Sequence, residues 1–418
     1  MANLSKPREA ALKVLVACEK DGAYLNIALR DILSSGNMDS RDNALATTIA
    51  FGVMKHRLFI DNIIENLSTV KLKKLSVWIH NILRIGVFCL KFLDRIPPSA
   101  TVNECVRLSR RYGHSASAGY VNAVLRKSSS CGDFLPENTE SDEYMSIKYS
   151  LPLWLVKMWK SEGYGEEFFR ALNEEPPVTV RLNTLKGHSL GEGFEKISTS
   201  PYAYNYTGGG SVENTTEFKS GSVTVQDLAS QKAILALNPQ KGTSVLDLCS
   251  APGGKSAFMA QLMENSGKIV ACDIHSHKLP LIKNNFSRQG VTNAEVVLND
   301  ATLFNKDFEN AFDTVLADVP CSGLGVMRRK PDIKWTKTQP GNDELTKIQR
   351  SILENAAKYV KKGGSLMYST CTVNKAENED NTTWFLKEHG EFSLVSQRLL
   401  LPHTDGTDGF FYALFERM

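Results

Sequence analysis

The chain has 418 residues, of which 42% are hydrophobic and 23% charged, and its formal net charge is +3. This composition is ordinary for a folded soluble protein, and the length is typical of two or three domains. It contains no run of about 18 apolar residues. The N-terminus mixes charged with apolar residues, so we expect neither a membrane span nor a secretory leader, and a cytoplasmic location.

Eight cysteines are spread along the chain, at positions 18, 89, 105, 131, 249, 272, 321 and 371. None of them forms a CxxC pair, and no histidines cluster beside them. A zinc site or a disulfide framework is therefore not expected. We predict reduced thiols and no bound metal.

The positive charge is concentrated in the first third of the chain. Residues 1–128 carry 19 Lys and Arg against 10 Asp and Glu, which gives a formal charge of +9. Such an excess is typical of a domain that binds a polyanion. A solvated basic surface would have the same composition, so charge alone leaves both interpretations open.

Residues 1–130 predict an all-helical domain. Apolar side chains recur at helical spacing in residues 8–20, and residues 78–93 are apolar nearly all round, which indicates a central, buried helix. Thr101 and Glu104 have the spacing of a capping box, so we expect a helix to start there and to end near Gly113.

Residues 131–148 are acidic, polar and contain a proline, which is typical of a linker. Residues 149–235 mix helical stretches with short strands at 177–185 and 221–227. They predict a small α+β subdomain that leads into the last part of the chain.

Residues 236–418 predict a doubly wound α/β sheet of the Rossmann-like type. Five candidate strands, at 244–250, 268–273, 294–300, 312–320 and 364–372, alternate with helix-like segments, as in a parallel sheet. Two further strands, 392–401 and 409–417, follow each other without a helix. They predict an antiparallel hairpin at the edge of the sheet.

Polar residues end the first three of these strands, where open α/β sheets bind ligands. The first strand leads into DLCSAPGGKS, whose Gly253 and Gly254 let a ligand approach the backbone closely at a helix start. The loop fits neither GxGxxG nor a Walker A motif. Asp273 is placed to bind ribose hydroxyls, and Asn299-Asp300 to accept from an adenine amino group. Each acid alone is typical of a turn or helix cap, but together and in this order they predict S-adenosylmethionine.

The fourth and fifth strands each end at a cysteine, Cys321 shortly after Asp318 and Cys371 within TCT. If the two strands are neighbours, both thiols and Asp318 face one pocket. Methyl transfer to nitrogen or oxygen needs no thiol, whereas C5 of cytosine becomes nucleophilic only after a thiolate adds to C6. Protonation at N3 assists that addition, and Asp318 could supply the proton.

The other cysteines have a simpler interpretation. Cys18, Cys89, Cys105 and Cys272 lie in apolar runs and are expected to be small buried hydrophobic residues. Cys249 is ambiguous, because it lies in the glycine loop. Cys321 and Cys371 lie at strand ends among turn residues, which favours a function for both.

Several motifs carry a resemblance to a known family. DLCSAPGGKS (247–256), DVPCSGLG (318–325), YSTCT (368–372) with ENE (377–379), and DGTDGFFYALFER (405–417) resemble the RNA cytosine-5 methyltransferases of the Nop/Sun family. VQDLASQ (225–231) resembles the segment that leads into their catalytic core. In the first third, YLN (24–26), RIGVFCL, IPPSATVNECV and YVNAVLRK resemble NusB, a helical RNA-binding domain. The combination covers nearly the whole chain and is similar to the bacterial branch of the family that acts on 16S rRNA.

The resemblance implies a set of ligands and site residues. It implies S-adenosylmethionine as cofactor, leaving as S-adenosylhomocysteine, without a metal, and 16S rRNA as partner; we expect a monomer. It implies a cofactor loop formed by Cys249, Ser250, Ala251, Pro252, Gly253, Gly254 and Lys255, with further cofactor contacts at Asp273, Asp300 and Asp318. It also implies that Cys371 is the nucleophile and that Cys321 helps to release the methylated RNA. Spacing alone leaves the choice between the two thiols open.

Two other functions stay open from the sequence. One is a tRNA cytosine-5 methyltransferase with the same chemistry, against which the NusB-like segment argues. The other is a non-catalytic RNA-binding factor of ribosome assembly, against which the intact thiols and glycine loop argue.

The segment MRRKPDIKW (327–335) is a further candidate for RNA contact. Arg328, Arg329 and Lys330 could touch phosphate, and Trp335 could stack on a base. A solvated loop with a buried Trp335 is the other interpretation.

Overall fold

The structure, a computed structural model, describes residues 5–35, 38–187, 189–337 and 343–418. The chain divides into two compact units. Met1–Glu174 and Arg329–Gln339 form the first, and Glu175–Arg328 and Pro340–Met418 form the second. This division is coarser than the four segments predicted from the sequence and does not test their boundaries.

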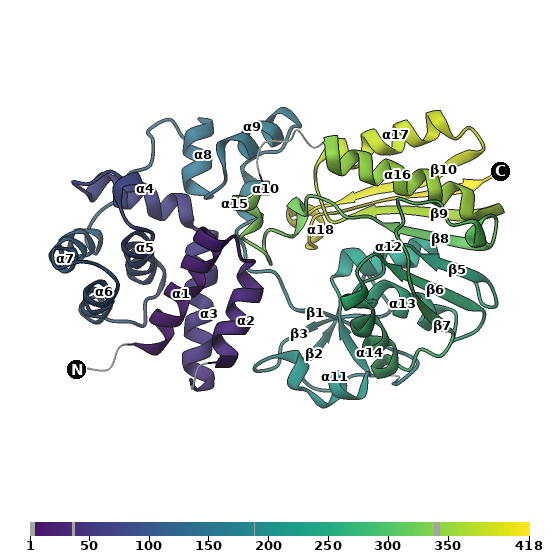
Figure 1. The fold of residues 1–418 in the computed structure, drawn as a ribbon, viewed down its shortest axis with the longest axis horizontal. Coiled ribbons are helices and arrows are strands. Elements are labelled where there is room, and N and C mark those ends of the chain that lie inside the picture. Colours follow the sequence, from purple (N-terminus) through teal and green to yellow (C-terminus); the bar gives the residue numbers. More distant parts are fainter. Residues whose placement is uncertain (1–4, 36–37, 188, 338–342) are drawn as a thin grey trace. The chain divides into compact units, whose positions relative to one another are not determined.

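The first unit is built from helices, as predicted (Figure 1). They are α1 (Lys6–Asp21), α2 (Leu25–Ser35), α3 (Ser40–Lys55), α4 (Arg57–Leu67), α5 (Val77–Phe92), α6 (Pro98–Tyr112), α7 (Ser117–Ser128), α8 (Asp142–Lys148), α9 (Leu153–Ser161), α10 (Glu166–Ala171) and α15 (Ile333–Thr336), with the 3₁₀ turn η1 (Leu72–Lys74). Helix α5 packs against α1, α3, α4, α6 and α7. Its nearly all-round apolar pattern therefore marks a central helix, and that prediction is confirmed.

Helix α6 begins at Pro98, so the predicted capping box at Thr101 and Glu104 is wrong. Proline suits the first turn because its fixed φ is helical and its missing N–H has no partner there anyway. Thr101 is buried inside the helix. Glu104 Oε2 instead accepts a hydrogen bond from the backbone N–H of Ser5, just before α1, at 3.0 Å. The predicted helix end at Gly113 is confirmed.

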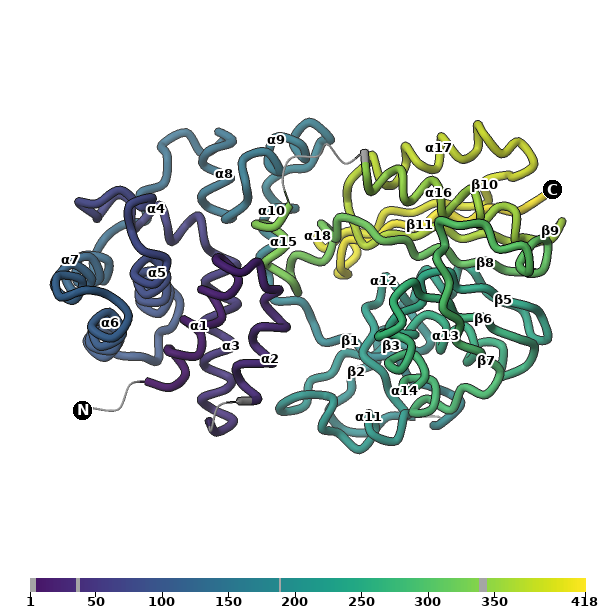
Figure 2. Tube along the Cα trace, viewed as in Figure 1, coloured from purple at the N-terminus to yellow at the C-terminus, as the bar shows by residue number. Residues whose placement is uncertain are grey.

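Residues 329–337 belong to the first unit although in sequence they lie between DVPCSGLG (318–325) and YSTCT (368–372), which belong to the second. Figure 2 shows this green stretch, with α15, beside the blue trace of α10. The indole Nε1 of Trp335 donates to the carbonyl of Met54 at 2.8 Å, and the Arg57 guanidinium lies 5.3 Å from its ring centroid. Trp335 is thus partly buried against protein, which favours the packing interpretation of this residue over stacking on a base.

The neighbours of Trp335 have protein partners as well. Lys334 Nζ donates to Asn173 Oδ1 at 2.8 Å, and Arg328, in the second unit, pairs with Asp408 at 3.2 Å. Arg328 is 8% exposed. Its predicted availability for RNA phosphate is therefore contradicted, because the guanidinium is already held by a carboxylate inside the protein.

The second unit starts with a small antiparallel sheet of order β2-β3-β1-β4. Its strands are β1 (Thr179–Leu182), β2 (Phe194–Lys196), β3 (Ala203–Tyr206) and β4 (Val223–Val225), with η2 (Val212–Asn214) and α11 (Thr216–Ser220) before β4. Arg181 on β1 is fully buried and donates to the carbonyl of Gly254 at 3.0 Å. The small sheet is thereby attached directly to the glycine loop.

The large sheet has the order β10-β11-β9-β8-β5-β6-β7. Its strands are β5 (Ser244–Asp247), β6 (Lys268–Asp273), β7 (Ala294–Leu298), β8 (Phe312–Asp318), β9 (Val360–Thr370), β10 (Phe392–Leu400) and β11 (Phe410–Arg417). Strands β5 to β9 are parallel, whereas β11 runs antiparallel to β9 and β10 antiparallel to β11. The predicted doubly wound sheet with an antiparallel edge hairpin is confirmed, except that the short α18 (Pro402–Asp405) lies within the hairpin connection.

Helices cover both faces of the large sheet (Figure 1). The helices α16 (Asp343–Tyr359) and α17 (Glu379–Glu388) lie on one face, and α12 (Leu228–Leu237), α13 (Gly254–Leu262) and α14 (Leu279–Gln289) on the other. The connections also contain the 3₁₀ turns η3 (Ser276–Lys278), η4 (Lys306–Phe308), η5 (Leu324–Val326) and η6 (Lys375–Glu377). No helix among the residues described is long and apolar enough to cross a membrane.

Candidate active site

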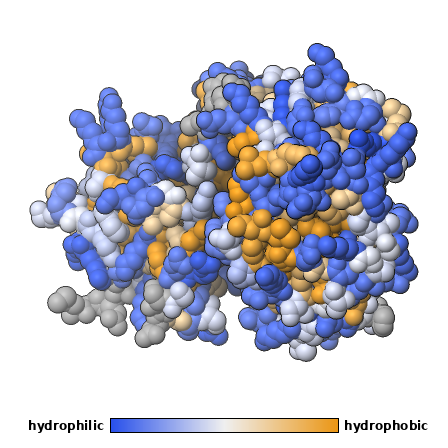
Figure 3. Space-filling model, turned by 45° about the vertical axis from the view of Figure 1, so that its right-hand side comes forward, coloured by the Kyte–Doolittle hydropathy of each residue, from blue (hydrophilic) through white to orange (hydrophobic). Residues whose placement is uncertain are grey.

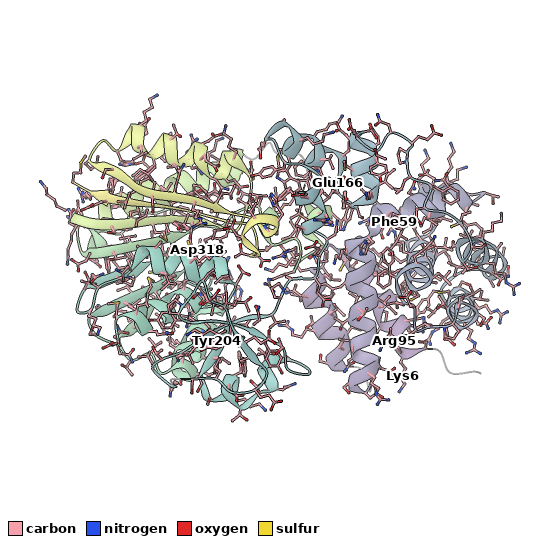
Figure 4. All side chains as sticks on the ribbon, turned by 180° about the vertical axis from the view of Figure 1, so that it is seen from behind. Lys6, Phe59, Arg95, Glu166, Tyr204 and Asp318 are labelled. Carbon is pink, nitrogen blue, oxygen red and sulfur yellow. The ribbon has the colours of Figure 1, made fainter. Side chains whose placement is uncertain are left out.

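The site lies where the strand order of the large sheet reverses. From β5 the chain continues outward through β6 and β7 on one side, and through β8 and β9 on the other. The carboxyl ends of β5 and β8 therefore flank a crevice, which is where open α/β sheets bind ligands. Figure 4 labels Asp318, the last residue of β8, at this position.

The glycine loop connects β5 to α13 and lines a cavity of about 170 Å³. Gly253 has φ +98°, where any other residue would be strained, and a Cβ there would lie 3.1 Å from Ile282 Cγ2, a tight contact. The lining residues are Val225, Gln226, Ser230, Asp247, Cys249, Ser250, Ala251, Pro252, Gly254, Lys255 and Asp318. Six of the seven loop residues implied by the resemblance thus face one cavity, and Gly253 shapes it.

Asp247 is a cavity residue that the sequence reasoning missed. It is 1% exposed, and its carboxylate accepts hydrogen bonds from the Ser256 hydroxyl and the Cys249 backbone. Burial, helped by the negative charge of Asp318, raises its pKa to about 6. Asp247 could have been predicted as a site residue, because it is the last residue of β5.

Asp318 is bound on both carboxylate oxygens. Lys255 Nζ donates to Oδ2 at 2.6 Å, and the Ser369 hydroxyl donates to Oδ1 at 2.7 Å. Burial lowers the pKa of Lys255, but the adjacent Asp318 carboxylate more than offsets this and raises it overall. Lys255 is therefore a fixed cation at the carboxyl end of β8. Its ion pair with Asp318 links the glycine loop to β8.

The two cysteines predicted at strand ends are neighbours. Strands β8 and β9 pair in parallel, and the sulfur atoms of Cys321 and Cys371 are 3.2 Å apart. A disulfide needs about 2.05 Å, so both are thiols. Cys321 Sγ also accepts from the backbone N–H of Cys371 at 3.3 Å. The strands that precede the two cysteines, β8 and β9, are therefore adjacent, as the sequence-based prediction of a shared site required.

The surroundings of the two thiols are electrostatically unequal. The hydrogen bond with Cys371 is the main cause that raises the pKa of Cys321 well above its ordinary value, followed by burial and the charges of Cys371 and Glu377. The cation of Lys255 interacts favourably with Cys371. The cation of Lys255 therefore favours negative charge on Cys371, whereas the surroundings of Cys321 disfavour it.

Asp273 is the last residue of β6, and Asp300 lies two residues beyond the end of β7. Neither residue lines the cavity described above. Asp273 Oδ1 accepts from the backbone of His275 at 2.9 Å, and Asp300 Oδ1 accepts from the backbone of Thr302 at 2.9 Å. Each acid thus makes the local turn that its sequence context also allowed. The Oδ2 atom of each makes no hydrogen bond to another described residue.

Apolar side chains are exposed near these two acids. Ile274, Leu298 and Leu303 are 53%, 56% and 65% exposed. The space-filling view shows several hydrophobic areas, of which the largest lies right of centre (Figure 3). Carboxylates with an available oxygen beside apolar surface are the groups that a ribose and an adenine ring require.

The remaining cysteines do not form part of the reactive pair. Cys89, Cys105 and Cys272 are buried, as expected for small hydrophobic residues, and Cys18 is partly buried. Cys249 lines the cavity, but burial and then the charge of Asp247 raise its pKa well above the ordinary value. Among the described residues no group of His, Cys, Asp or Glu could hold a metal ion.

Comparison with known proteins agrees with both units. Residues 234–416 match the family described as 16S rRNA methyltransferase RsmB/F, and residues 5–130 match the NusB family. The "Probable ribosomal RNA small subunit methyltransferase B" of Bacillus subtilis is 34% identical, with 97% of each chain covered. The corresponding protein of Photorhabdus laumondii is 32% identical over 99% of each chain. Among solved structures, PH0851 superimposes with a TM-score of 0.82 at 29% identity, covering all of both chains.

Proposed function

The chain belongs to the family of ribosomal RNA small subunit methyltransferases B, and from this premise we propose that it methylates C5 of one cytosine in 16S rRNA. The methyl donor is S-adenosylmethionine. The observation that carries the proposal is the pair of thiols 3.2 Å apart beside the Lys255–Asp318 ion pair. Methylation at nitrogen or oxygen would leave both thiols without a task.

The residues around the cavity suit S-adenosylmethionine. The loop from Cys249 to Lys255 would hold its methionine end, and Asp273 and Asp300, each with one available oxygen, would hold ribose and adenine. Asp318 also lines the cavity. When bound, the cofactor supplies an electrophilic methyl group on a sulfonium sulfur.

In the first half of the reaction, the thiolate of Cys371 forms a bond to C6 of the cytosine. The electron pair of the C5–C6 double bond moves into the ring, where protonation at N3 stabilises it, so that C5 becomes nucleophilic. Asp318 is placed to deliver that proton, and Lys255, 2.6 Å away, can replace it. C5 would then take the methyl group, whose bond to the sulfonium sulfur would break to leave S-adenosylhomocysteine. The cytosine would then be joined to the protein through Cys371 and methylated at C5.

In the second half, C5 loses its proton, the C5–C6 double bond returns, Cys371 leaves C6 as a thiolate, and N3 returns its proton to Asp318. Cys321 is the candidate base for the C5 proton. Its thiol is kept protonated mainly by Cys371. Once Cys371 is bound to the cytosine it is a neutral thioether, so Cys321 can ionise and take the proton from C5. The two thiols therefore act in sequence rather than as alternatives.

The helical first unit has the charge that an RNA-binding unit needs. Residues 1–128 carry a formal charge of +9, which attracts phosphate without regard to sequence. We expect it to help hold the rRNA while the second unit receives a cytosine that has left its stack. An rRNA substrate locates the reaction in the cytoplasm, and all proposed site residues come from a single chain, which is consistent with a monomer.

Methyl transfer to purified RNA tests the proposal. The protein is incubated with isotopically labelled S-adenosylmethionine and either deproteinised 16S rRNA, assembled small subunits or bulk tRNA, and the product is mapped by bisulfite sequencing. We expect one methylated cytosine in 16S rRNA, and its absence from cells lacking the gene. Label in tRNA alone would favour the tRNA enzyme. Absence of both cofactor binding and label would favour a non-catalytic assembly factor.

A further inference from the structure

We propose that Glu377 is a positioning residue that fixes the two cysteine loops against each other and so makes product release possible. Glu377 ends the turn η6, between β9 and α17. It neither lines the cavity nor touches a thiol, so it would act through the residues it binds and through its charge, which helps to raise the pKa of Cys321. The inference rests on the proposed function, because it assigns a role within the second half of that reaction.

The carboxylate of Glu377 is fully buried and bridges the two loops. Oε2 accepts from the backbone N–H of Ser322, the residue after Cys321, at 2.9 Å. Oε1 accepts from Asn374 Nδ2, three residues after Cys371, at 2.9 Å. One rigid side chain thus sets the distance between the two loops.

Further hydrogen bonds fix the carboxylate itself. Gln349 Nε2, from α16, donates to Oε2 at 2.9 Å and to the carbonyl of Pro320 at 3.1 Å. The Ser322 and Thr372 hydroxyls, each next to a cysteine, are 2.7 Å apart. The loops are therefore joined twice, once by the Glu377 carboxylate and once by this pair of hydroxyls.

A buried carboxylate without a cation needs a reason, because its burial costs free energy unless it is well compensated. No Lys, Arg or His in the described part of the chain forms an ion pair with Glu377. Its compensation comes from three N–H donors, two of which belong to the cysteine loops. An apolar residue could fill the space, but only an acceptor on both oxygens can hold both loops.

The two steps of the proposed reaction depend on this bridge to different degrees. Attack needs Cys371, on the end of β9, and Asp318, on the end of β8, which the sheet itself holds. Release needs Cys321 next to Cys371 as well. Weakening the bridge should therefore leave attack and methyl transfer largely intact, slow release, and accumulate the covalent protein–RNA complex.

Glu377→Gln is the direct test, because the amide has one acceptor and one donor and can serve only one of the loops. We expect single-turnover methyl transfer close to that of the wild type. Release should slow by roughly tenfold to hundredfold, the range for loss of one hydrogen bond to a charged group. The protein–RNA complex should then appear on a denaturing gel.

Glu379→Gln is the matched control. It removes the same charge two residues away, from a partly buried side chain that bonds to its own backbone. It should release product as the wild type does. The double variant Cys321→Ser/Glu377→Gln should trap no more complex than Cys321→Ser alone, because both changes act on the same step.

Three outcomes would overturn the inference. One is normal release by Glu377→Gln. Another is loss of its single-turnover methyl transfer while Cys321→Ser still traps the complex. The third is equal trapping by Glu379→Gln. Melting and cofactor binding show whether Glu377→Gln folds. If it does not, Asn374→Ala replaces it, because that variant removes one of the three hydrogen bonds to Glu377. Product release and the covalent complex are then measured in the same way. Failure of the Cys321→Ser arm itself to trap RNA would count against the proposed function instead.

Discussion

Asp247→Asn should make the stability of the second unit less dependent on pH. In the wild type, burial and the charge of Asp318 raise the pKa of Asp247 from 3.8 to about 6. The shift corresponds to about 3 kcal/mol at 1.36 kcal/mol per unit, an upper limit. Because the folded state binds this proton more tightly, the associated stability is complete below pH 3.8 and is lost as pH rises through about 6.

The variant removes this pH dependence without removing the hydrogen bonds. An asparagine at 247 can accept from the backbone of Cys249 and donate to the hydroxyl of Ser256. We therefore expect it to exceed the wild type in stability by up to about 3 kcal/mol at pH 8 and by about 1 kcal/mol at pH 4.5. A gain in stability from a cavity residue would be the usual exchange between stability and function.

Hydrogen exchange measured by mass spectrometry is the appropriate assay, because the chain has two units and a single unfolding free energy is not defined for it. Peptides from β5, β6 and β8 report on the second unit alone. Comparing both proteins at each pH cancels the intrinsic pH dependence of exchange. A difference in protection that is the same at pH 4.5 and pH 8 would refute the assignment of a raised pKa to Asp247.

Three further predictions concern the cofactor residues and the anchor in the first unit. Asp273→Ala should weaken cofactor binding by roughly tenfold to hundredfold with unchanged melting; unchanged affinity in calorimetry would remove Asp273 from the site. Gly253→Ala should abolish measurable cofactor binding, because φ is +98° and Ile282 lies 3.1 Å from the added Cβ; wild-type affinity would show that the loop adapts. Trp335→Ala should destabilise the first unit by about 3 kcal/mol, seen as faster exchange in α3. Unaltered exchange with weaker RNA binding would restore the base-stacking interpretation.

The fold of the second unit could be predicted because each strand is a short apolar run that ends in polar residues. The runs at 244–250, 268–273 and 312–320 correspond to β5, β6 and β8. Local pattern is sufficient there, since a parallel sheet buries its strands on both faces. The capping box at Thr101 failed because Pro98 already starts the helix, so one local signal overrode another.

The site was predictable where chemistry follows from one strand end and not where it depends on contacts between distant residues. Cys321, Cys371 and Asp318 could be named because each lies at the end of a strand or within three residues after it. The partners of Asp318, Lys255 and Ser369, lie 63 and 51 positions away in sequence. Spacing carries no information on such pairs. The electrostatic difference between the two thiols arises from the same kind of contact.

For the same reason, the sequence could not show that residues 329–337 pack within the helical unit. A segment with Arg328, Arg329, Lys330 and Trp335 has the composition of an RNA-binding loop. The hydrogen bond from Trp335 to the Met54 carbonyl joins residues 281 positions apart. Composition describes the segment, whereas its neighbours decide whether the side chains face solvent or protein.

The order of the two thiols is the central claim and can be tested with one gel. Wild type, Cys371→Ser and Cys321→Ser are incubated with 16S rRNA and S-adenosylmethionine, and covalent protein–RNA complexes are separated under denaturing conditions. We predict a stable complex for Cys321→Ser and none for Cys371→Ser, which should also lack turnover. A complex formed by Cys371→Ser and none by Cys321→Ser would reverse the roles of the two residues and contradict the account.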